Sequence, residues 1–223
     1  MKQVAVLGLG DFGAALVRQL TKNKVSVLAV DISRTRIEAL KDEVDHVIIA
    51  DITHAAALEK MGLLAMDAVI IATSSPMPTS VLAVLRLKEL GVERIIAKAE
   101  NEDHAKVLSA LGVTEIVNPE EDSAIRVANK ISWTNVVEMV ELSSGYSIME
   151  VSPPEEVVGK SLRNSGLRDR YHVEVLAVRE TPGERLEAIP SPDRVINAES
   201  TLVVFGHDTQ LANLRREAER REK

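Results

Sequence analysis

Three glycines near the start of the chain have the spacing of a phosphate-binding turn. Gly8, Gly10 and Gly13 form the pattern G-x-G-x-x-G after an apolar run, residues 4–7, and open a helical segment that runs through residue 20. We expect the first glycine to allow a tight turn, the second to let the backbone approach a phosphate, and the third to let the helix pack on the strand. The free N–H groups and positive end of that helix favour an anion. The spacing therefore predicts a nucleotide site.

A carboxylate follows at the position where a nucleotide's ribose would lie. A second apolar run, residues 25–30, ends in Asp31, about twenty residues after the glycines, and a carboxylate there accepts hydrogen bonds from ribose hydroxyls. A 2′-phosphate at this place would meet a negative charge. The alternative interpretation is an ordinary strand-to-helix turn followed by a solvated Asp31.

Short apolar runs alternate with helical patterns over the first half of the chain. The helices are indicated over residues 79–89 and 103–111, each followed by a glycine. This alternation predicts an α/β fold, a Rossmann-like doubly wound parallel sheet with right-handed crossovers. The six expected strands cover residues 4–7, 25–30, 46–49, 68–72, 94–97 and 115–117.

Polar residues follow the later strands of this expected sheet. In such a sheet, ligands lie outside the carboxyl ends of the strands, so these residues are candidates to line the pocket. Strand-end polar residues are also ordinary helix N-caps, which is the alternative for Thr53 and Ser75. For Asp51, contact with the adenine amino group and helix capping stay equally open, whereas Lys98 is a cation suited to a phosphate. The candidates are Asp51, Thr53, Thr73, Ser74, Ser75, Lys98, Glu100, Asn118 and Glu120.

A helix is expected to begin at Pro119, followed by acidic residues that suit a helix start.

A second helix is predicted over residues 133–142, with more apolar positions than one stripe needs, which indicates contact with a partner. The composition changes at residue 143, so we expect two domains, residues 1–143 and 144–223. The second is predicted to be a small α+β lobe, and it shows no catalytic constellation.

Composition excludes several classes of protein. The 223 residues carry a formal net charge of −7 and only 2% aromatic residues, which argues against a nucleic-acid surface. Cysteine is absent and no apolar stretch of 18 residues is present, so we expect a cytoplasmic protein without a membrane span.

The whole chain, from residue 4 to about residue 206, resembles the RCK family of cytosolic regulators of K⁺ conductance, and particularly the ring-forming subunits of Ktr/Trk potassium transport systems. V-L-G-L-G-D-F-G, which contains Phe12, is similar to the family's nucleotide loop, and L-A-V-D to its ribose-binding strand end. Four more segments match its later elements: D-A-V-I-I-A-T, L-R-L-K-E-L-G-V, I-I-A-K-A-E-N and V-N-P-E-E-D. L-R-D-R-Y-x-V-x-V-L-A-V-R and T-L-V-V-F-G resemble its C-terminal ligand-sensing subdomain.

The resemblance implies a regulatory subunit without enzymatic turnover. It would form a homo-oligomer, a dimer or an octameric ring, on the inner face of the cell membrane, and gate a membrane K⁺-translocating subunit in response to adenine nucleotides. The rival hypothesis is an NAD-dependent oxidoreductase, which the first half alone would suit, although no acid–base pair stands in a substrate domain. A third is a nucleotide-binding dimer without a membrane partner.

One residue departs from the family pattern. Members that respond to ATP commonly carry arginine before the loop phenylalanine, where it reaches the terminal phosphate, and this chain has Asp11. A carboxylate there would repel a γ-phosphate, so NAD(H), ADP or AMP is favoured over ATP.

Two further sites are implied by the family. Glu120 is the candidate for an Mg²⁺ or Ca²⁺ site between protomers, with a helix-capping role as the alternative. The C-terminal lobe of the family can bind cyclic di-AMP, and here Arg168 would offer a guanidinium to a phosphate while Val175 and Pro190 supply apolar walls. The alternative is that Arg168 pairs with Asp169 or Glu174.

Overall fold

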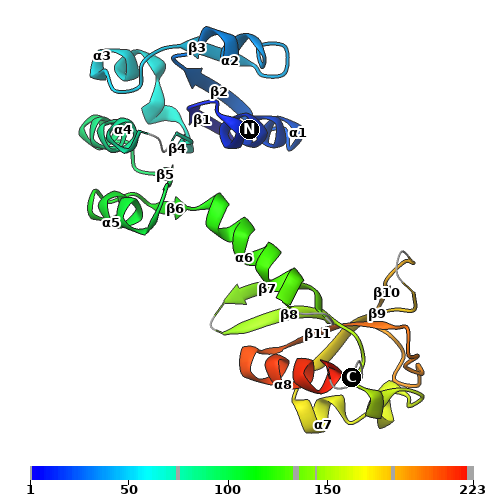
Figure 1. Cartoon of the computed structure of the whole chain (residues 1–223). Coiled ribbons are helices and arrows are strands. Elements are labelled where there is room, and N and C mark those ends of the chain that lie inside the picture. Colours follow the sequence, from blue (N-terminus) through cyan, green and yellow to red (C-terminus); the bar gives the residue numbers. More distant parts are fainter. Residues whose placement is uncertain (1, 74–75, 133–135, 144, 182–183, 220–223) are drawn as a thin grey trace. The chain divides into compact units, whose positions relative to one another are not determined.

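The computed structural model describes residues 2–73, 76–132, 136–143, 145–181 and 184–219. The chain divides into two compact units, residues 1–123 and 124–223. Figure 1 shows the elements of both along the chain. The division falls within helix α6 (Pro119–Ser132).

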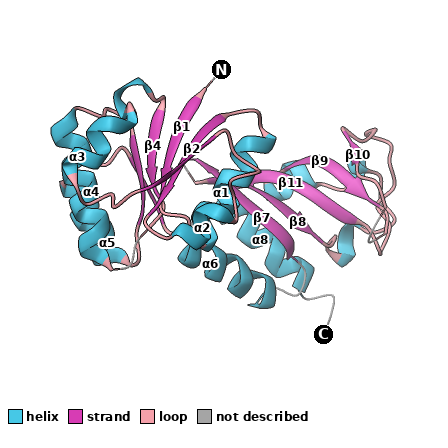
Figure 2. Cartoon of the chain, turned by 90° about the horizontal axis from the view of Figure 1, so that it is seen from above, coloured by secondary structure: helices cyan, strands magenta, loops and turns pink. Residues whose placement is uncertain are grey.

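The first unit is a six-stranded parallel sheet with helices on both faces (Figure 2). The strand order is β3-β2-β1-β4-β5-β6, so the direction of winding reverses between β1 and β4. The strands are β1 (Gln3–Leu7), β2 (Ser26–Asp31), β3 (His46–Ile49), β4 (Ala68–Ile71), β5 (Ile95–Lys98) and β6 (Glu115–Val117). The helices are α1 (Asp11–Lys22), α2 (Arg34–Glu38), α3 (Ala55–Leu58), α4 (Met77–Leu90) and α5 (Glu102–Ala110), with 3₁₀ turns η1 (Glu59–Met61) and η2 (Leu63–Ala65).

Two apolar clusters form the core of this unit, one on each face of the sheet. Val17 of α1 and Ile37 of α2 belong to one, and Leu58, Leu87 and Leu108 of α3, α4 and α5 belong to the other. The middle strands are buried on both faces, which explains their continuous apolar runs. The predicted doubly wound α/β sheet is therefore confirmed.

The second unit holds a five-stranded antiparallel sheet of order β10-β9-β11-β8-β7. Helices α7 and α8 contribute Tyr171, Leu211 and Leu214 to the core beneath the sheet, as the expected α+β lobe requires. The strands are β7 (Val136–Ser143), β8 (Tyr146–Val151), β9 (Glu174–Arg179), β10 (Glu187–Ala188) and β11 (Thr201–His207). The helices are α7 (Leu167–Tyr171) and α8 (Asp208–Glu219), with 3₁₀ turns η3 (Glu155–Val157) and η4 (Leu162–Asn164).

The helix predicted over residues 133–142 is wrong where the structure describes that segment. Residues 136–143 form strand β7, while residues 133–135 lie outside the described part. Three valines in this segment are β-branched, and Gly145, with a φ of +77°, allows the chain to turn back into β8. Pairing with β8 thus overrides the helical pattern. Val140 and Leu142 remain about half exposed on this edge strand.

The expected domain division at residues 143/144 lies between the paired strands β7 and β8. As a division between functional domains it stays a prediction. Among the residues that the structure describes, no helix combines the length and the apolar character needed to cross a membrane.

Candidate functional site

The glycine turn joins β1 to α1 at the carboxyl end of the sheet. Gly8 has a φ of +99° and donates its N–H to the Val30 carbonyl at 2.8 Å. A Cβ built at Gly13 would lie 2.0 Å from the Gly8 carbonyl oxygen, so this helical position admits only glycine without a backbone shift. Gly10 differs, because its extended backbone is open to any residue and a Cβ there would meet no atom within 4 Å. The space in front of Gly10 is therefore free for a ligand.

Asp31 fastens this turn to the end of β2. Its Oδ2 accepts the Leu9 N–H at 2.6 Å, and its Oδ1 accepts the Ser33 N–H at 2.7 Å. Arg36 adds a long contact, with Nη1 3.4 Å from Oδ2. The residue is only 4% exposed, so the alternative of a solvated surface acid is wrong. The carboxylate therefore organises the loop, and contact of Asp31 with a ribose stays a prediction.

A cavity of about 400 Å³ opens beside these residues. Five of the predicted residues line it: Gly8, Asp31, Asp51, Thr53 and Thr73. The cavity is also lined by residues that the sequence did not single out: Ile32, Arg36, Ala50, Ile52, Pro76 and Thr79. The position of Ile32, directly after the strand that ends in Asp31, is a sequence signal that could have been used.

Asp51 and Thr53 form a tight turn at one wall of the cavity. Asp51 Oδ1 accepts the backbone N–H of Thr53 at 2.9 Å and its hydroxyl at 2.7 Å. These two bonds, together with His54 nearby, lower the pKa of Asp51. Helix α3 begins after His54 without a side-chain cap, so neither Asp51 nor Thr53 serves as its N-cap. Contact of Asp51 with a ligand stays a prediction.

Lys98, predicted to face a phosphate, pairs with Glu120. The Lys98 ammonium donates to the Glu120 carboxylate and lies 5.9 Å from the centre of the Phe12 ring. Lys98 is only 13% exposed, while Glu120 is 66% exposed. The hydrogen bond from Lys98 lowers the pKa of Glu120. The lysine thus brings together the start of α1, the end of β5 and the start of α6.

The remaining predicted residues of this site lie nearby in the fold or outside the described part. Asp11 is the exposed first residue of α1, and Glu100 follows β5 and begins the turn into α5. Ser74 and Ser75 lie outside the described residues. Among the residues that are described, no group of three acidic, histidine or cysteine side chains is arranged to hold a metal.

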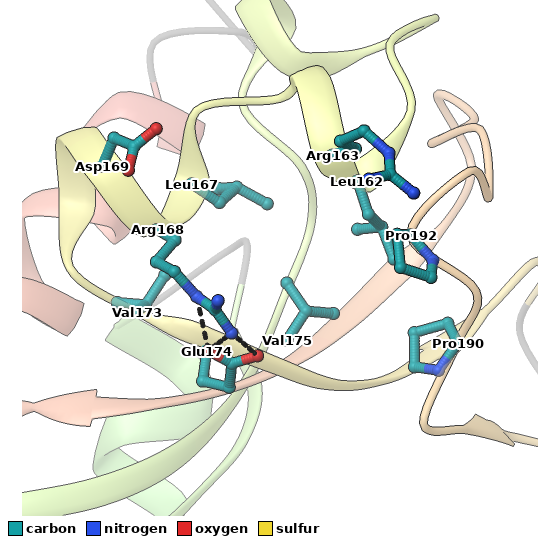
Figure 3. Close-up of a pocket in the computed structure, with 10 residues that line it drawn as sticks. All are labelled: Leu162, Arg163, Leu167, Arg168, Asp169, Val173, Glu174, Val175, Pro190 and Pro192. Carbon is teal, nitrogen blue, oxygen red and sulfur yellow. Dashed lines mark hydrogen bonds and ion pairs between the residues drawn. The ribbon is translucent and has the colours of Figure 1, made fainter.

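The second unit has a pocket of about 350 Å³ where the cyclic di-AMP site is expected (Figure 3). Arg168, Val175 and Pro190 all line it. Arg168 makes a double ion pair with Glu174, with Nε at 2.9 Å and Nη2 at 2.6 Å from the carboxylate, so the pairing alternative is realised in this state. Arg163, which the sequence analysis missed, lies across the pocket from Arg168 and pairs with Asp193.

Comparison with known proteins adds to this geometry. The TrkA-N domain model matches residues 4–119, and the TrkA-C domain model matches residues 146–218. The chain belongs to the TrkA (RCK) family. The resemblance recognised in the sequence is thereby confirmed.

Named relatives agree with this assignment, and a solved structure agrees with the fold. Ktr system potassium uptake protein C of Bacillus subtilis is 35% identical over 95% of this chain and 95% of its own length. Ktr system potassium uptake protein A of Vibrio alginolyticus is 35% identical over 95% of this chain and 96% of its own. The GsuK channel bound to NAD shares the fold, with a TM-score of 0.66 and 20% identity over 97% of this chain and 39% of the channel.

Proposed function

We propose that this chain is a regulatory subunit of a potassium uptake system that binds an adenine nucleotide in its first unit. The observation that carries the proposal is the cavity at the carboxyl end of the parallel sheet, where a buried carboxylate fastens the glycine turn and still borders open space. In a family of potassium uptake proteins, such a pocket has an evident use as a sensor.

The nucleotide is proposed to be NAD(H), ADP or AMP. Its phosphates would meet the Gly10 backbone and the start of α1, and its ribose would meet Asp31. Asp11 at the first position of α1 disfavours a γ-phosphate, which makes ATP the weaker candidate. The GsuK channel, whose structure was solved with NAD bound, supports this choice of ligand class.

The partner is proposed to be a membrane K⁺-translocating subunit, with this chain assembled as a homo-oligomer, a dimer or an octameric ring, on the cytoplasmic face. Ile125, Val127 and Ile131 of α6 are exposed, and so are Val140 and Leu142 of β7. Such surfaces suit contacts with further copies. Control would follow from differential affinity, because a nucleotide shifts the ring toward whichever conformation binds it better.

Two ligands are proposed beyond the nucleotide. Glu120 would bind Mg²⁺ or Ca²⁺ with oxygen ligands from a second copy, which requires release of Lys98. Cyclic di-AMP would occupy the pocket bordered by Arg168, Val175 and Pro190, which requires Arg168 to exchange Glu174 for a phosphate. Glu120 is 66% exposed and so within reach of a second copy, and Arg168, Val175 and Pro190 border an open pocket.

The deciding experiment reconstitutes the chain with a Ktr-type membrane subunit and measures K⁺ flux with and without nucleotide. Flux should depend on nucleotide, and a ligand at one hundred times its dissociation constant should stabilise the chain by about 2.7 kcal/mol. Asp31→Ala should abolish both effects. Asp67→Ala is the matched control, because Asp67 also accepts a backbone N–H, from Gln3 at 2.7 Å, at the start of β1.

The rival enzyme hypothesis has its own readout. Hydride transfer between NAD(H) and a small substrate at enzyme-like rates would replace this proposal with an oxidoreductase. Nucleotide binding that leaves K⁺ flux unchanged would instead favour a nucleotide-binding dimer without a membrane partner.

A further inference from the structure

His104 of α5 is a fully buried histidine with a hydrogen bond at each ring nitrogen. Its Nδ1 accepts the Glu100 N–H at 3.1 Å, so this nitrogen carries no proton. Its Nε2 lies 2.8 Å from Ser80 Oγ, and the Ser80 hydroxyl donates its single hydrogen to the Met77 carbonyl at 2.9 Å. Nε2 must then be the donor to Ser80. The bonds fix a neutral ring with its proton on Nε2.

One end of this chain of hydrogen bonds lies on helix α4 beside the cavity, and the other lies in the segment after β5. Ser80 and Met77 belong to the first turn of α4, which also holds the cavity-lining Thr79 and follows the cavity-lining N-cap Pro76. Glu100 belongs to the segment that follows β5, two residues after Lys98. The imidazole therefore ties the wall formed by α4 to the strand end that carries the lysine.

Few charges act on the ring. Glu100 faces it and favours the protonated form, whereas burial has the larger effect and lowers the pKa of His104. On α5 itself, Glu102 and Asp103 are exposed and pair with Lys106. From α4 the ring meets a hydroxyl that is committed to a carbonyl. A proton added at Nδ1 would point at the Glu100 N–H, so protonation must break that bond.

We propose that neutral His104 is a positioning residue of the nucleotide pocket, holding the first turn of α4 against the segment that follows β5. Where it concerns ligand affinity, this inference rests on the proposed nucleotide binding. The hydrogen-bonded link through His104, called the tether below, does not depend on nucleotide binding.

Acid should release the tether. Because the pKa of His104 is lowered in the folded chain, the unfolded state binds more protons below about pH 6.5, the ordinary value for histidine. The free energy of unfolding should therefore fall as the pH falls through that value. Affinity for a nucleotide should weaken only at lower pH, where the folded ring itself takes up a proton and the α4 wall loses its attachment.

The test measures NAD⁺ affinity by calorimetry between pH 5.5 and 8, because the phosphates of NAD⁺ do not titrate in this range. All variants carry His54→Gln, which removes a second histidine, 3.2 Å from the cavity-lining Asp51. The reference chain should keep its affinity as the pH falls through 6.5 and lose it several-fold only toward pH 5.5, where the folded ring takes up a proton. His104→Gln keeps an amide N–H for Ser80 but loses the ring nitrogen that accepts the Glu100 N–H, so it should bind about fivefold more weakly at pH 8. Because glutamine does not titrate, its affinity should show a flat pH profile. Ser80→Ala should weaken binding at pH 8 and keep part of the slope.

A matched control separates positioning from general stability. Asn101→Ala removes the cap of α5, whose Oδ1 accepts the His104 backbone N–H at 2.9 Å, without touching the ring. It should cost stability and leave the pH profile of NAD⁺ affinity unchanged. An Asn101→Ala profile as flat as that of His104→Gln would reduce His104 to a structural residue.

Ring nitrogen NMR of the unliganded chain tests the tether without any nucleotide. The His104 proton should be found on Nε2, and the ring should stay neutral well below pH 6.5. A proton on Nδ1, or ordinary titration of this ring, would overturn the inference. Failure of the reference chain to bind NAD⁺, with the expected NMR result, would count against the proposed nucleotide and leave the tether standing.

Discussion

Two glycines of the same turn should respond in opposite ways to a single added methyl group. At Gly10 the backbone is extended, with a φ of −67°, and a Cβ would have no neighbour within 4 Å. Alanine is a poorer N-cap than glycine, but it also restricts the unfolded chain, and these effects oppose one another. We therefore expect Gly10→Ala to change the free energy of unfolding by less than about 1 kcal/mol.

The same change at Gly10 should damage ligand binding. The methyl group would occupy the space through which a phosphate approaches the backbone, and a tenfold loss of affinity corresponds to about 1.4 kcal/mol. At a nucleotide concentration one hundred times the wild-type dissociation constant, ligand stabilisation should fall from about 2.7 to about 1.4 kcal/mol.

At Gly13 the methyl group would meet the backbone itself. Its Cβ would stand 2.0 Å from the Gly8 carbonyl oxygen and 3.1 Å from the Ala72 Cβ, so α1 would have to move away from the turn. Overpacking of a buried site costs about 1–3 kcal/mol, and a clash with rigid backbone belongs at or above the upper end. We expect Gly13→Ala to lower the melting temperature by about 10 °C.

Urea unfolding and nucleotide calorimetry on both variants provide the measurements. Wild-type affinity in Gly10→Ala would show that no phosphate approaches this backbone. Wild-type stability in Gly13→Ala would show that α1 does not approach Gly8 as closely as the structure has it.

The other predictions concern charge and assembly. Asp11→Arg should raise affinity for ATP relative to AMP, and an unchanged ratio in calorimetry would mean that residue 11 does not face the phosphates. Stabilisation of the nucleotide complex by Mg²⁺ or Ca²⁺ should disappear in Glu120→Gln, and its persistence would reject that assignment. Glu174→Ala should free Arg168 and strengthen cyclic di-AMP binding, whereas Arg168→Ala should abolish it, so equal binding by both would exclude this pocket. Val140→Asp should reduce the oligomer seen by light scattering while nucleotide still binds.

The alternation of apolar runs and helical patterns was sufficient to predict every strand of the first sheet, because buried parallel strands and their covering helices have distinct periods. Residues 136–142 were misassigned to a helix because their apolar pattern does not exclude one, and only pairing with β8 decides for a strand. Local pattern contains no information about a partner strand.

The candidate site shows the same limit. Spacing identified Gly8, Asp31 and Thr73, which line one cavity because the carboxyl ends of parallel strands meet. It did not reveal that Asp31 binds the Leu9 N–H, nor that Lys98 already has a partner in Glu120. Such contacts arise between segments far apart in sequence, and the residue types alone do not select among the available partners.

The order of strands in the second sheet has a consequence for synthesis of the chain. Strand β11 lies between β8 and β9, and among the described strands it is the last to leave the ribosome. Until residues 201–207 emerge, β8 and β9 lack the strand that joins them, and their edges stay open to pairing with other chains. The first sheet can form before residues 201–207 are synthesised, because its last strand ends at Val117. The chain can therefore complete its first sheet during translation, whereas a polypeptide shortened before residue 201 would expose two unpaired edges.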